Sequence, residues 1–202
     1  MKKTVVLVML ASALTLAGCA SSEKSSAPIA SQTDSKKQPQ AIVFDIDGTL
    51  TPHPLSIFEA RPDAANAVRI FAERGYKIIY LSARKPWFQA GIRDWLTKNN
   101  FPEGNLQLLQ PTDPKEEHDY PDVFKRRVLE DFSKHGWRVM YAYGDSHTDF
   151  VAYELANIPH FFGLIREGEA KCQPDHWQLC LKGGWTGHLE FLRDSVPRVP
   201  TN

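Results

Sequence analysis

Residues 41–51 read Ala41-Ile42-Val43-Phe44-Asp45-Ile46-Asp47-Gly48-Thr49-Leu50-Thr51. The first four residues are apolar and predict a short buried strand that ends at Asp45. Gly48 permits a sharp turn directly after this strand. Asp45 and Asp47 are two residues apart, so extended backbone would place their carboxylates on the same side. By itself the pair is also consistent with a solvated loop, because Asp and Gly are ordinary turn residues.

Strand and helix patterns alternate along the chain after this stretch. Short apolar runs predict further strands over residues 77–81, 106–109, 138–143 and 160–164. Apolar residues at helical spacing predict helices over residues 60–74, 87–99, 122–134 and 148–156. This alternation predicts an α/β fold with a doubly wound, mostly parallel sheet.

Polar residues stand at the carboxyl ends of three predicted strands. They are Asp45, Ser82 and Asp145. Ligands bind open α/β sheets beyond the carboxyl ends of the strands, so we expect these side chains to meet at one crevice. Carboxylates as close as those of Asp45 and Asp47 repel each other unless a cation lies between them. Mg²⁺ suits this place because it prefers hard oxygen ligands and neutralises phosphate charge.

Four segments together resemble, in order, the motifs of the haloacid dehalogenase superfamily. They are residues 45–51, Ser82, Lys125 and Gly144-Asp145-Ser146-His147-Thr148-Asp149. The resemblance spans about residues 41–164. It implies a Rossmann-like fold of the haloacid dehalogenase type and Mg²⁺-dependent hydrolysis of a phosphomonoester through an aspartyl-phosphate.

The resemblance also implies a role for each catalytic residue. Asp45 would be the nucleophile, which splits one difficult step into two. Asp47 would protonate the leaving alcohol and then activate water. Ser82 would hydrogen-bond a phosphoryl oxygen, and Lys125 would balance the charge of the transition state. Arg126 and Arg127, which directly follow Lys125, are alternative candidates for the same role.

The metal and phosphate ligands follow from the same comparison. Asp45, Asp47 and Asp145 would ligate Mg²⁺, and Asp149 would orient either the metal shell or the lysine. Substrate contacts would come from Ser82, Lys125 and Arg84. Arg84 can bind a phosphate with two parallel hydrogen bonds, although a surface salt bridge is an equal alternative.

A closer resemblance is to the lipin family and the related LNS2 domain. It rests on residues 45–51, Tyr80-Leu81-Ser82-Ala83-Arg84, Val139-Met140-Tyr141-Ala142-Tyr143-Gly144 and Asn157-Ile158-Pro159. Lipins hydrolyse phosphatidate to diacylglycerol, so the resemblance implies a lipid phosphate as substrate. Two features depart from the pattern of these families. They are the pair Ser146-His147 and the segment between Cys172 and Cys180. Three alternatives stay open: a broad-specificity periplasmic phosphatase for soluble esters, a non-catalytic phosphatidate-binding module, and a structural lipoprotein with a vestigial site.

The spacing of the motifs leaves little room for a cap domain over the crevice. Residues 50–77 hold little more than one helix, and residues 110–121 hold only a loop, so we expect a minimal cap or none. An open crevice suits a large substrate or one presented by a membrane. Phe58, Trp87 and Phe88 lie near the crevice and either contact lipid or pack in the core.

The first 40 residues are typical of a segment for export and are not expected to belong to the folded domain. Lys2 and Lys3 precede an apolar run that is too short to span a membrane comfortably, so residues 1–18 read as a signal peptide. The run ends in Leu16-Ala17-Gly18-Cys19, which resembles the lipobox of bacterial lipoproteins, although a plain secretory signal is the alternative. Residues 19–40 would be a disordered tether, and residues 41–202 the phosphatase domain. With Ala20 after Cys19, the resemblance implies a lipid-anchored protein of the outer membrane that faces the periplasm.

The charge balance and the two remaining cysteines indicate what the protein binds and how its cysteines are used. The 202 residues carry 24 basic and 24 acidic side chains. The chain therefore has no excess of positive charge of the kind that would indicate a nucleic-acid-binding protein. The sequence leaves the oligomeric state open. Cys172 and Cys180 predict a disulfide in an oxidising compartment, and a metal site that includes His176 between them is the alternative.

Overall fold

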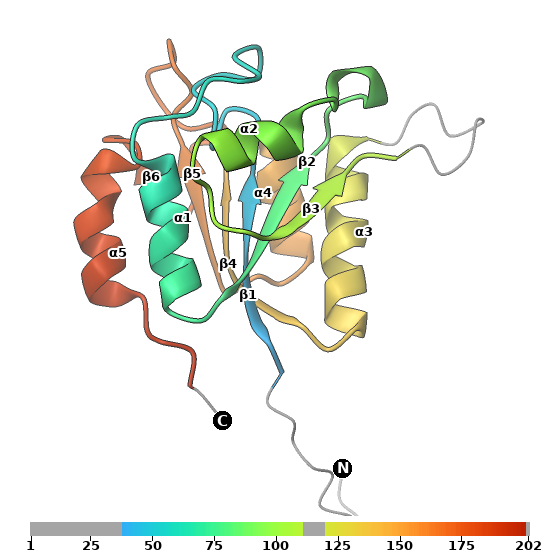
Figure 1. The fold of residues 1–202 in the computed structure, drawn as a ribbon, viewed down its shortest axis with the longest axis vertical. Helices are drawn as coiled ribbons and strands as arrows, with labels where there is room; N and C mark the ends of the chain where they lie inside the picture. The colour runs from blue at the N-terminus through green and yellow to red at the C-terminus, as the bar shows by residue number, and fades with distance from the viewer. Residues whose placement is uncertain (1–37, 111–119, 201–202) are drawn as a thin grey trace, which may run out of the picture. The chain divides into compact units, whose positions relative to one another are not determined.

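The computed structural model describes residues 38–110 and 120–200, and residues Lys36–Asn202 form one compact unit (Figure 1). The predicted signal peptide, the lipidation site Cys19 and almost all of the predicted tether lie outside the described residues. So does most of the predicted loop between the third strand and the following helix.

A six-stranded sheet forms the centre of the molecule. Its strands are β1 (Gln40–Asp45), β2 (Lys77–Ser82), β3 (Asn105–Leu108), β4 (Arg138–Gly144), β5 (His160–Leu164) and β6 (Cys180–Leu181). Neighbouring strands are parallel, and their order is β3-β2-β1-β4-β5-β6. The predicted α/β, doubly wound, parallel architecture is confirmed.

Helices cover both faces of the sheet (Figure 1). They are α1 (Ala64–Glu73), α2 (Ile92–Lys98), α3 (Pro121–Lys134), α4 (His147–Leu155) and α5 (Leu189–Ser195), with short 3₁₀ turns η1 (Pro86–Phe88) and η2 (Thr186–His188). Apolar side chains of α1, α2 and α5 pack on one face of the sheet. Those of α3 and α4 pack on the other face. Each face therefore has its own core, and all of the packing lies within the compact unit.

Two predicted helices are shorter than their sequence patterns suggest. The single helix predicted over residues 87–99 is wrong, since Gly91 at φ 80° separates η1 from α2. The helix predicted from residue 60 begins at Ala64, because Asp63 before it has left-handed backbone at φ 60°. Both interruptions keep loops at the carboxyl edge of the sheet, where the site residues lie.

The carboxyl-terminal part of the chain adds elements that the sequence patterns did not predict. These are β6, η2 and α5. Cys172 and Cys180 form the predicted disulfide, which rules out the alternative of a metal site that uses their thiolates. Between β1 and β2 the chain has one helix, α1, as the prediction of a minimal cap requires. Within residues 38–110 and 120–200, no helix is long and apolar enough to cross a membrane.

Candidate active site

The predicted site residues gather where the strand order reverses. Chain order runs outward from β1 through β2 to β3 on one side, and from β4 to β6 on the other. Asp45 ends β1, and Asp145 directly follows β4, the neighbouring strand. Such a switch point is where open α/β sheets bind ligands. A pocket of about 380 Å³ opens there, with Asp45, Asp47, Arg84, Lys125 and Asp145 in its wall.

Lys125 holds two carboxylates at the base of this site. It lies on α3, and its Nζ donates to Oδ1 of Asp45 and to Oδ1 of Asp149, each at 2.6 Å. All three side chains are buried. Asp149 is fixed in turn because α4 begins with a capping box, in which Ser146 and Asp149 exchange side-chain to backbone hydrogen bonds. The capping box therefore fixes the carboxylate of Asp149 against the ammonium group of Lys125. Neither Arg126 nor Arg127 has this position, since neither lines the pocket.

Asp145 stands against the turn that follows β1. A Cβ atom at Gly48 would lie 2.1 Å from Oδ2 of Asp145, and Gly48 has φ +85°. Only glycine fits this turn without moving the carboxylate. The hydroxyl of Thr49 donates to Oδ1 of Asp145 at 3.4 Å, and the guanidinium of Arg166 forms an ion pair with Oδ2.

Asp47 faces the other side of the pocket. Ser82 donates its hydroxyl to Oδ2 of Asp47 at 2.7 Å, and Nε of Arg84 donates to Oδ1 at 2.6 Å. A further guanidinium nitrogen of Arg84 donates to the carbonyl of Ile57 at 2.8 Å. The side chain of Asp47 is thus held by Ser82 and Arg84, two of the three predicted phosphate-binding residues. It lies apart from the cluster formed by the other carboxylates.

Burial and mutual repulsion shift the protonation of the cluster. Burial raises the pKa of Asp45 well above its usual range, and Asp149 raises it further, whereas Lys125 lowers it. Burial and Asp149 likewise raise the pKa of Asp145 to about 6, against the opposing effect of Arg166. Burial lowers the pKa of Lys125, but Asp149 and Asp45 more than compensate, so that pKa lies above its ordinary value. The lysine therefore stays protonated in a site where burial disfavours the ionised forms of Asp45 and Asp145.

The cluster fits a divalent cation. One carboxylate oxygen from each of Asp45, Asp145 and Asp149 lies within 4.8 Å of the others. Oδ2 of Asp45 is buried and has no hydrogen-bond partner, which is costly unless a cation or donor completes the site. Three hard oxygen donors are the set that Mg²⁺ prefers. Among the described residues, the Asp47 side chain is not part of this cluster.

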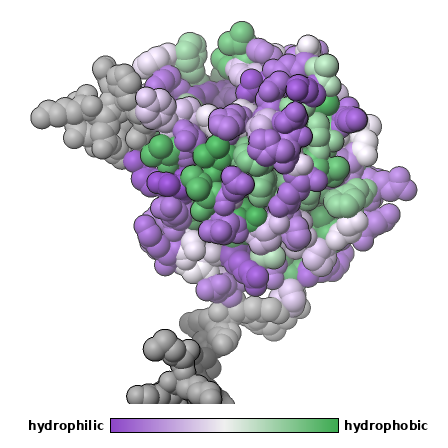
Figure 2. All heavy atoms as spheres, turned by 180° about the vertical axis from the view of Figure 1, so that it is seen from behind, coloured by the Kyte–Doolittle hydropathy of each residue, from purple (hydrophilic) through white to green (hydrophobic). Residues whose placement is uncertain are grey.

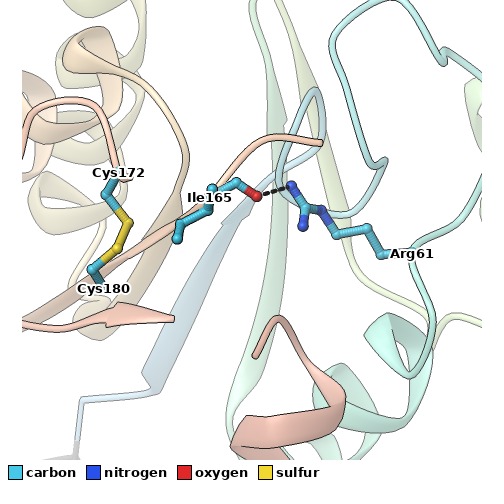
Figure 3. The surroundings of a disulfide bond; sticks show 4 residues. All are labelled: Arg61, Ile165, Cys172 and Cys180. Atoms are coloured by element: carbon cyan, nitrogen blue, oxygen red, sulfur yellow. Dashed lines mark hydrogen bonds between the residues drawn. A yellow bond between two sulfur atoms is a disulfide. The ribbon is translucent and has the colours of Figure 1, made fainter. Parts of the chain in front are cut away.

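Two arginines outside the predicted site residues, Arg61 and Arg166, also shape the site. Arg61 donates to the carbonyls of Gly48 at 2.6 Å and of Ile165 at 2.7 Å, and Figure 3 shows the second bond near the disulfide. It ties the turn after β1 to the segment after β5. Arg166 lies just beyond β5, so the rule that selected Asp145 at a strand end could have found it. No sequence signal marks the backbone contacts of Arg61.

A parallel α/β sheet with this carboxylate and lysine cluster at its switch point defines a haloacid dehalogenase-like fold. Solved structures agree. A D,D-heptose 1,7-bisphosphate phosphatase from B. bronchiseptica, complexed with magnesium and phosphate, superposes with TM-score 0.55 at 14% identity, covering 79% of this chain and all of that one. A protein described as a HAD-like phosphatase from Mesorhizobium loti superposes with TM-score 0.54 at 17% identity, covering 81% and 90%.

The chain belongs to the LNS2 domain family of the PITM 1-3 proteins, whose model matches residues 42–161. Human membrane-associated phosphatidylinositol transfer protein 1 is 35% identical over 164 residues, which is 76% of this chain and 12% of that protein. Protein retinal degeneration B of Drosophila melanogaster is 28% identical over 160 residues, again 76% and 12%. The chain thus matches about an eighth of the length of these relatives. The LNS2 part of the predicted resemblance is confirmed.

Proposed function

We propose that this protein hydrolyses phosphomonoesters with Mg²⁺ as cofactor, and that its substrate is phosphatidate or a similar lipid phosphate. The proposal rests on the environment of one atom, Oδ2 of Asp45. This oxygen is buried and unpartnered, while Lys125 holds the other oxygen of the same carboxylate at 2.6 Å. A carboxylate fixed on one oxygen and free on the other is oriented for attack.

The contacts support a two-step reaction. Oδ2 of Asp45 attacks phosphorus, the bond to the ester oxygen breaks, and Asp47 gives its proton to the departing alcohol. Asp47 then takes a proton from water, whose oxygen attacks phosphorus and releases inorganic phosphate and free Asp45. Bound at Asp45, Asp145 and Asp149, Mg²⁺ would supply charge neutralisation for the phosphoryl group.

Ser82 and Arg84 hold Asp47 in the structure and are also two of the three predicted phosphate ligands. Their donors occupy both oxygens of the Asp47 carboxylate. A bound phosphoryl group carries negatively charged oxygens that compete with the Asp47 carboxylate for the same donors. Substrate binding would therefore draw Ser82 and Arg84 away from Asp47 and leave that side chain able to carry the proton that the alcohol needs.

Two observations favour a lipid phosphate over a soluble ester. The pocket is lined by Pro54, Leu55, Ile57 and Phe88 beside its charged residues, which is a mixed surface of the kind that suits an amphipathic substrate. One of the relatives, human membrane-associated phosphatidylinositol transfer protein 1, bears a name that refers to a phosphorylated lipid. A phosphatidate-binding module without turnover is the second candidate, and the complete set of Asp45, Asp47 and Lys125 argues against it.

The decisive experiment compares two substrates. Protein that lacks residues 1–19, and so keeps the whole compact unit, is assayed against phosphatidate in mixed micelles and against a soluble aryl phosphate, with Mg²⁺ or with EDTA. We expect Mg²⁺-dependent turnover of phosphatidate. Turnover of the aryl phosphate alone would remove the lipid proposal, and turnover of neither would remove the enzyme proposal. Asp45→Asn should be inactive, whereas Asp194→Asn on the exposed face of α5 should be as active as the wild type.

We also propose that the protein is a lipoprotein of the cell envelope, anchored through Cys19 to the outer membrane and facing the periplasm. The support is the sequence Leu16-Ala17-Gly18-Cys19 after an apolar run, together with the disulfide Cys172–Cys180, which suits an oxidising compartment. Labelled palmitate should be incorporated into the wild type and not into Cys19→Ser. Equal labelling of both would rule the anchor out.

A further inference from the structure

Large apolar side chains stand exposed on two loops beside the pocket. Leu55 is 84% exposed and Phe58 50%, both between β1 and α1. Trp87 is 72% exposed and Phe88 54%, both in η1 after β2. We call these four residues the apolar rim. Both loops lie at the carboxyl edge of the sheet, and Figure 2 shows hydrophobic residues at the surface of that end of the molecule.

The two loops make one surface. The ring of Phe58 lies close to the backbone at the start of α2, since a Cβ atom at Gly91 would be 3.6 Å from it. The guanidinium carbon of Arg84 lies 5.8 Å from the centroid of the same ring. The rings of Trp87 and Phe88 have their centroids 6.2 Å apart. Apolar side chains that cluster in this way, rather than scatter singly, mark an interaction surface.

Two of the four rim residues also belong to the wall of the pocket, and the other two lie beside it. Leu55 and Phe88 line the same pocket as Asp45 and Lys125. Any macromolecule that covers the rim therefore also covers the mouth of the pocket. A protein partner or a second copy of this chain would close the pocket against substrate. A bilayer would cover the rim and present the phosphate headgroups of its own lipids to the pocket.

We propose that the apolar rim docks this protein on a lipid bilayer that contains anionic phosphate headgroups, with the pocket facing the membrane. The proposal rests on the proposed function and adds the surface that brings the site to its substrate. Trp and Phe are favoured at the boundary of headgroups and acyl chains. Exposed Lys85 directly precedes η1, and its ammonium group is attracted to an anionic bilayer.

The geometry of β1 explains why such a surface is needed. The chain enters the sheet at Gln40 and leaves β1 at Asp45, and these two ends of β1 lie at opposite edges of the sheet (Figure 1). Because Asp45 lines the pocket, the pocket lies at the edge away from Gln40. An anchor attached before Gln40 would hold the domain near a membrane without turning the pocket toward it. The apolar rim supplies that orientation.

Vesicle binding tests the proposal separately from catalysis. The chain without residues 1–19 carries Asp45→Asn, so that phosphatidate is not consumed, and is floated with phosphatidylcholine vesicles with or without phosphatidate. We expect Trp87→Ser to weaken binding to phosphatidate vesicles at least about tenfold. The control is Leu155→Ser, at a residue that is 53% exposed at the far end of α4, and it should bind as the parent does. Brominated lipid should quench the fluorescence of the parent more than that of Trp87→Ser.

Trp87 does not line the pocket, so Trp87→Ser with Asp45 restored should hydrolyse the soluble aryl phosphate at the rate of the wild type. Equal vesicle binding by the parent and Trp87→Ser, or an equal loss in Leu155→Ser, overturns the docking proposal. A concentration-dependent dimer that Trp87→Ser abolishes would also overturn it in favour of a second copy. If the wild type hydrolyses no ester, the proposed function is overturned instead. The vesicle assay does not depend on catalysis, so it still decides whether the rim docks on the bilayer.

Discussion

Gly48 lies directly against the carboxylate of Asp145, on the neighbouring strand end. A Cβ atom at residue 48 would stand 2.1 Å from Oδ2 and 2.6 Å from the carboxyl carbon of Asp145. No real Cβ makes such a contact, so either the turn or the carboxylate would have to move. The glycine therefore sets how closely the turn after β1 approaches the carboxylate cluster.

Gly48→Ala should abolish most phosphatase activity and destabilise the protein. Gly136→Ala is a matched control, because Gly136 also has φ +80° and would place its Cβ in open space. Both substitutions cost about 1–2 kcal/mol for left-handed backbone, and only the first displaces Asp145. Urea unfolding and turnover of an aryl phosphate measure the two effects. Equal loss of activity in both variants would show that the close approach is irrelevant.

Asp145 also has a partner that the sequence did not suggest, Arg166. Arg166→Gln should strengthen Mg²⁺ binding several-fold, because it removes a cation that competes for an oxygen of Asp145. Calorimetric titration with Mg²⁺ at constant pH gives the affinity. Arg126→Gln is the control, since Arg126 pairs with Glu130 at 3.5 Å on the exposed side of α3. Unchanged or weaker binding in Arg166→Gln would mean that Arg166 and the metal do not compete.

The parts of the site that could be predicted follow from local pattern and a general rule of sheets. Apolar runs place Asp45, Ser82 and Asp145 at strand ends, and parallel strands bring those ends to one edge. The partner that each side chain takes could not be predicted, because it depends on which charges the folded loops bring together. Asp47 is the clearest case, since its pairing with Arg84 depends on how the two loops turn.

Helix α5 and the break at Gly91 are hard to predict from the sequence for similar physical reasons. α5 spans seven residues, which is too short for a helical repeat to stand out. Its apolar residues Leu189 and Leu192 are recognisable only once the sheet face they cover is known. The break at Gly91 does not stand out in the sequence, because one glycine inside a periodic pattern is often tolerated.

The disulfide Cys172–Cys180 should contribute about 2–3 kcal/mol to the free energy of unfolding, as expected for a loop this short. The double variant Cys172→Ala with Cys180→Ala should lose that amount in urea. A thiol reductant should lower the stability of the wild type to the level of the variant and leave the variant unchanged. A reductant effect of equal size on both proteins would show that the loss comes from elsewhere in the chain.

The stability of the protein should depend on pH through His188. Its Nε2 lies 2.9 Å from the hydroxyl of Tyr143 in the core, and burial lowers its pKa to about 4. In the unfolded chain histidine has a pKa of about 6.5, so the folded protein binds fewer protons between these values. Stability should therefore fall as the pH drops from about 6.5 to about 4, by at most about 3 kcal/mol from this residue.

His188→Gln isolates this contribution, because glutamine does not titrate in that range. Its free energy of unfolding, measured in urea at intervals from pH 7 to pH 4, should fall less steeply than that of the wild type. The carboxylates affect both proteins alike, so the difference between the two curves belongs to His188. His135→Gln, at the exposed end of α3, should follow the wild-type curve. Parallel curves for His188→Gln and the wild type would show that the buried histidine is not what acid destabilises.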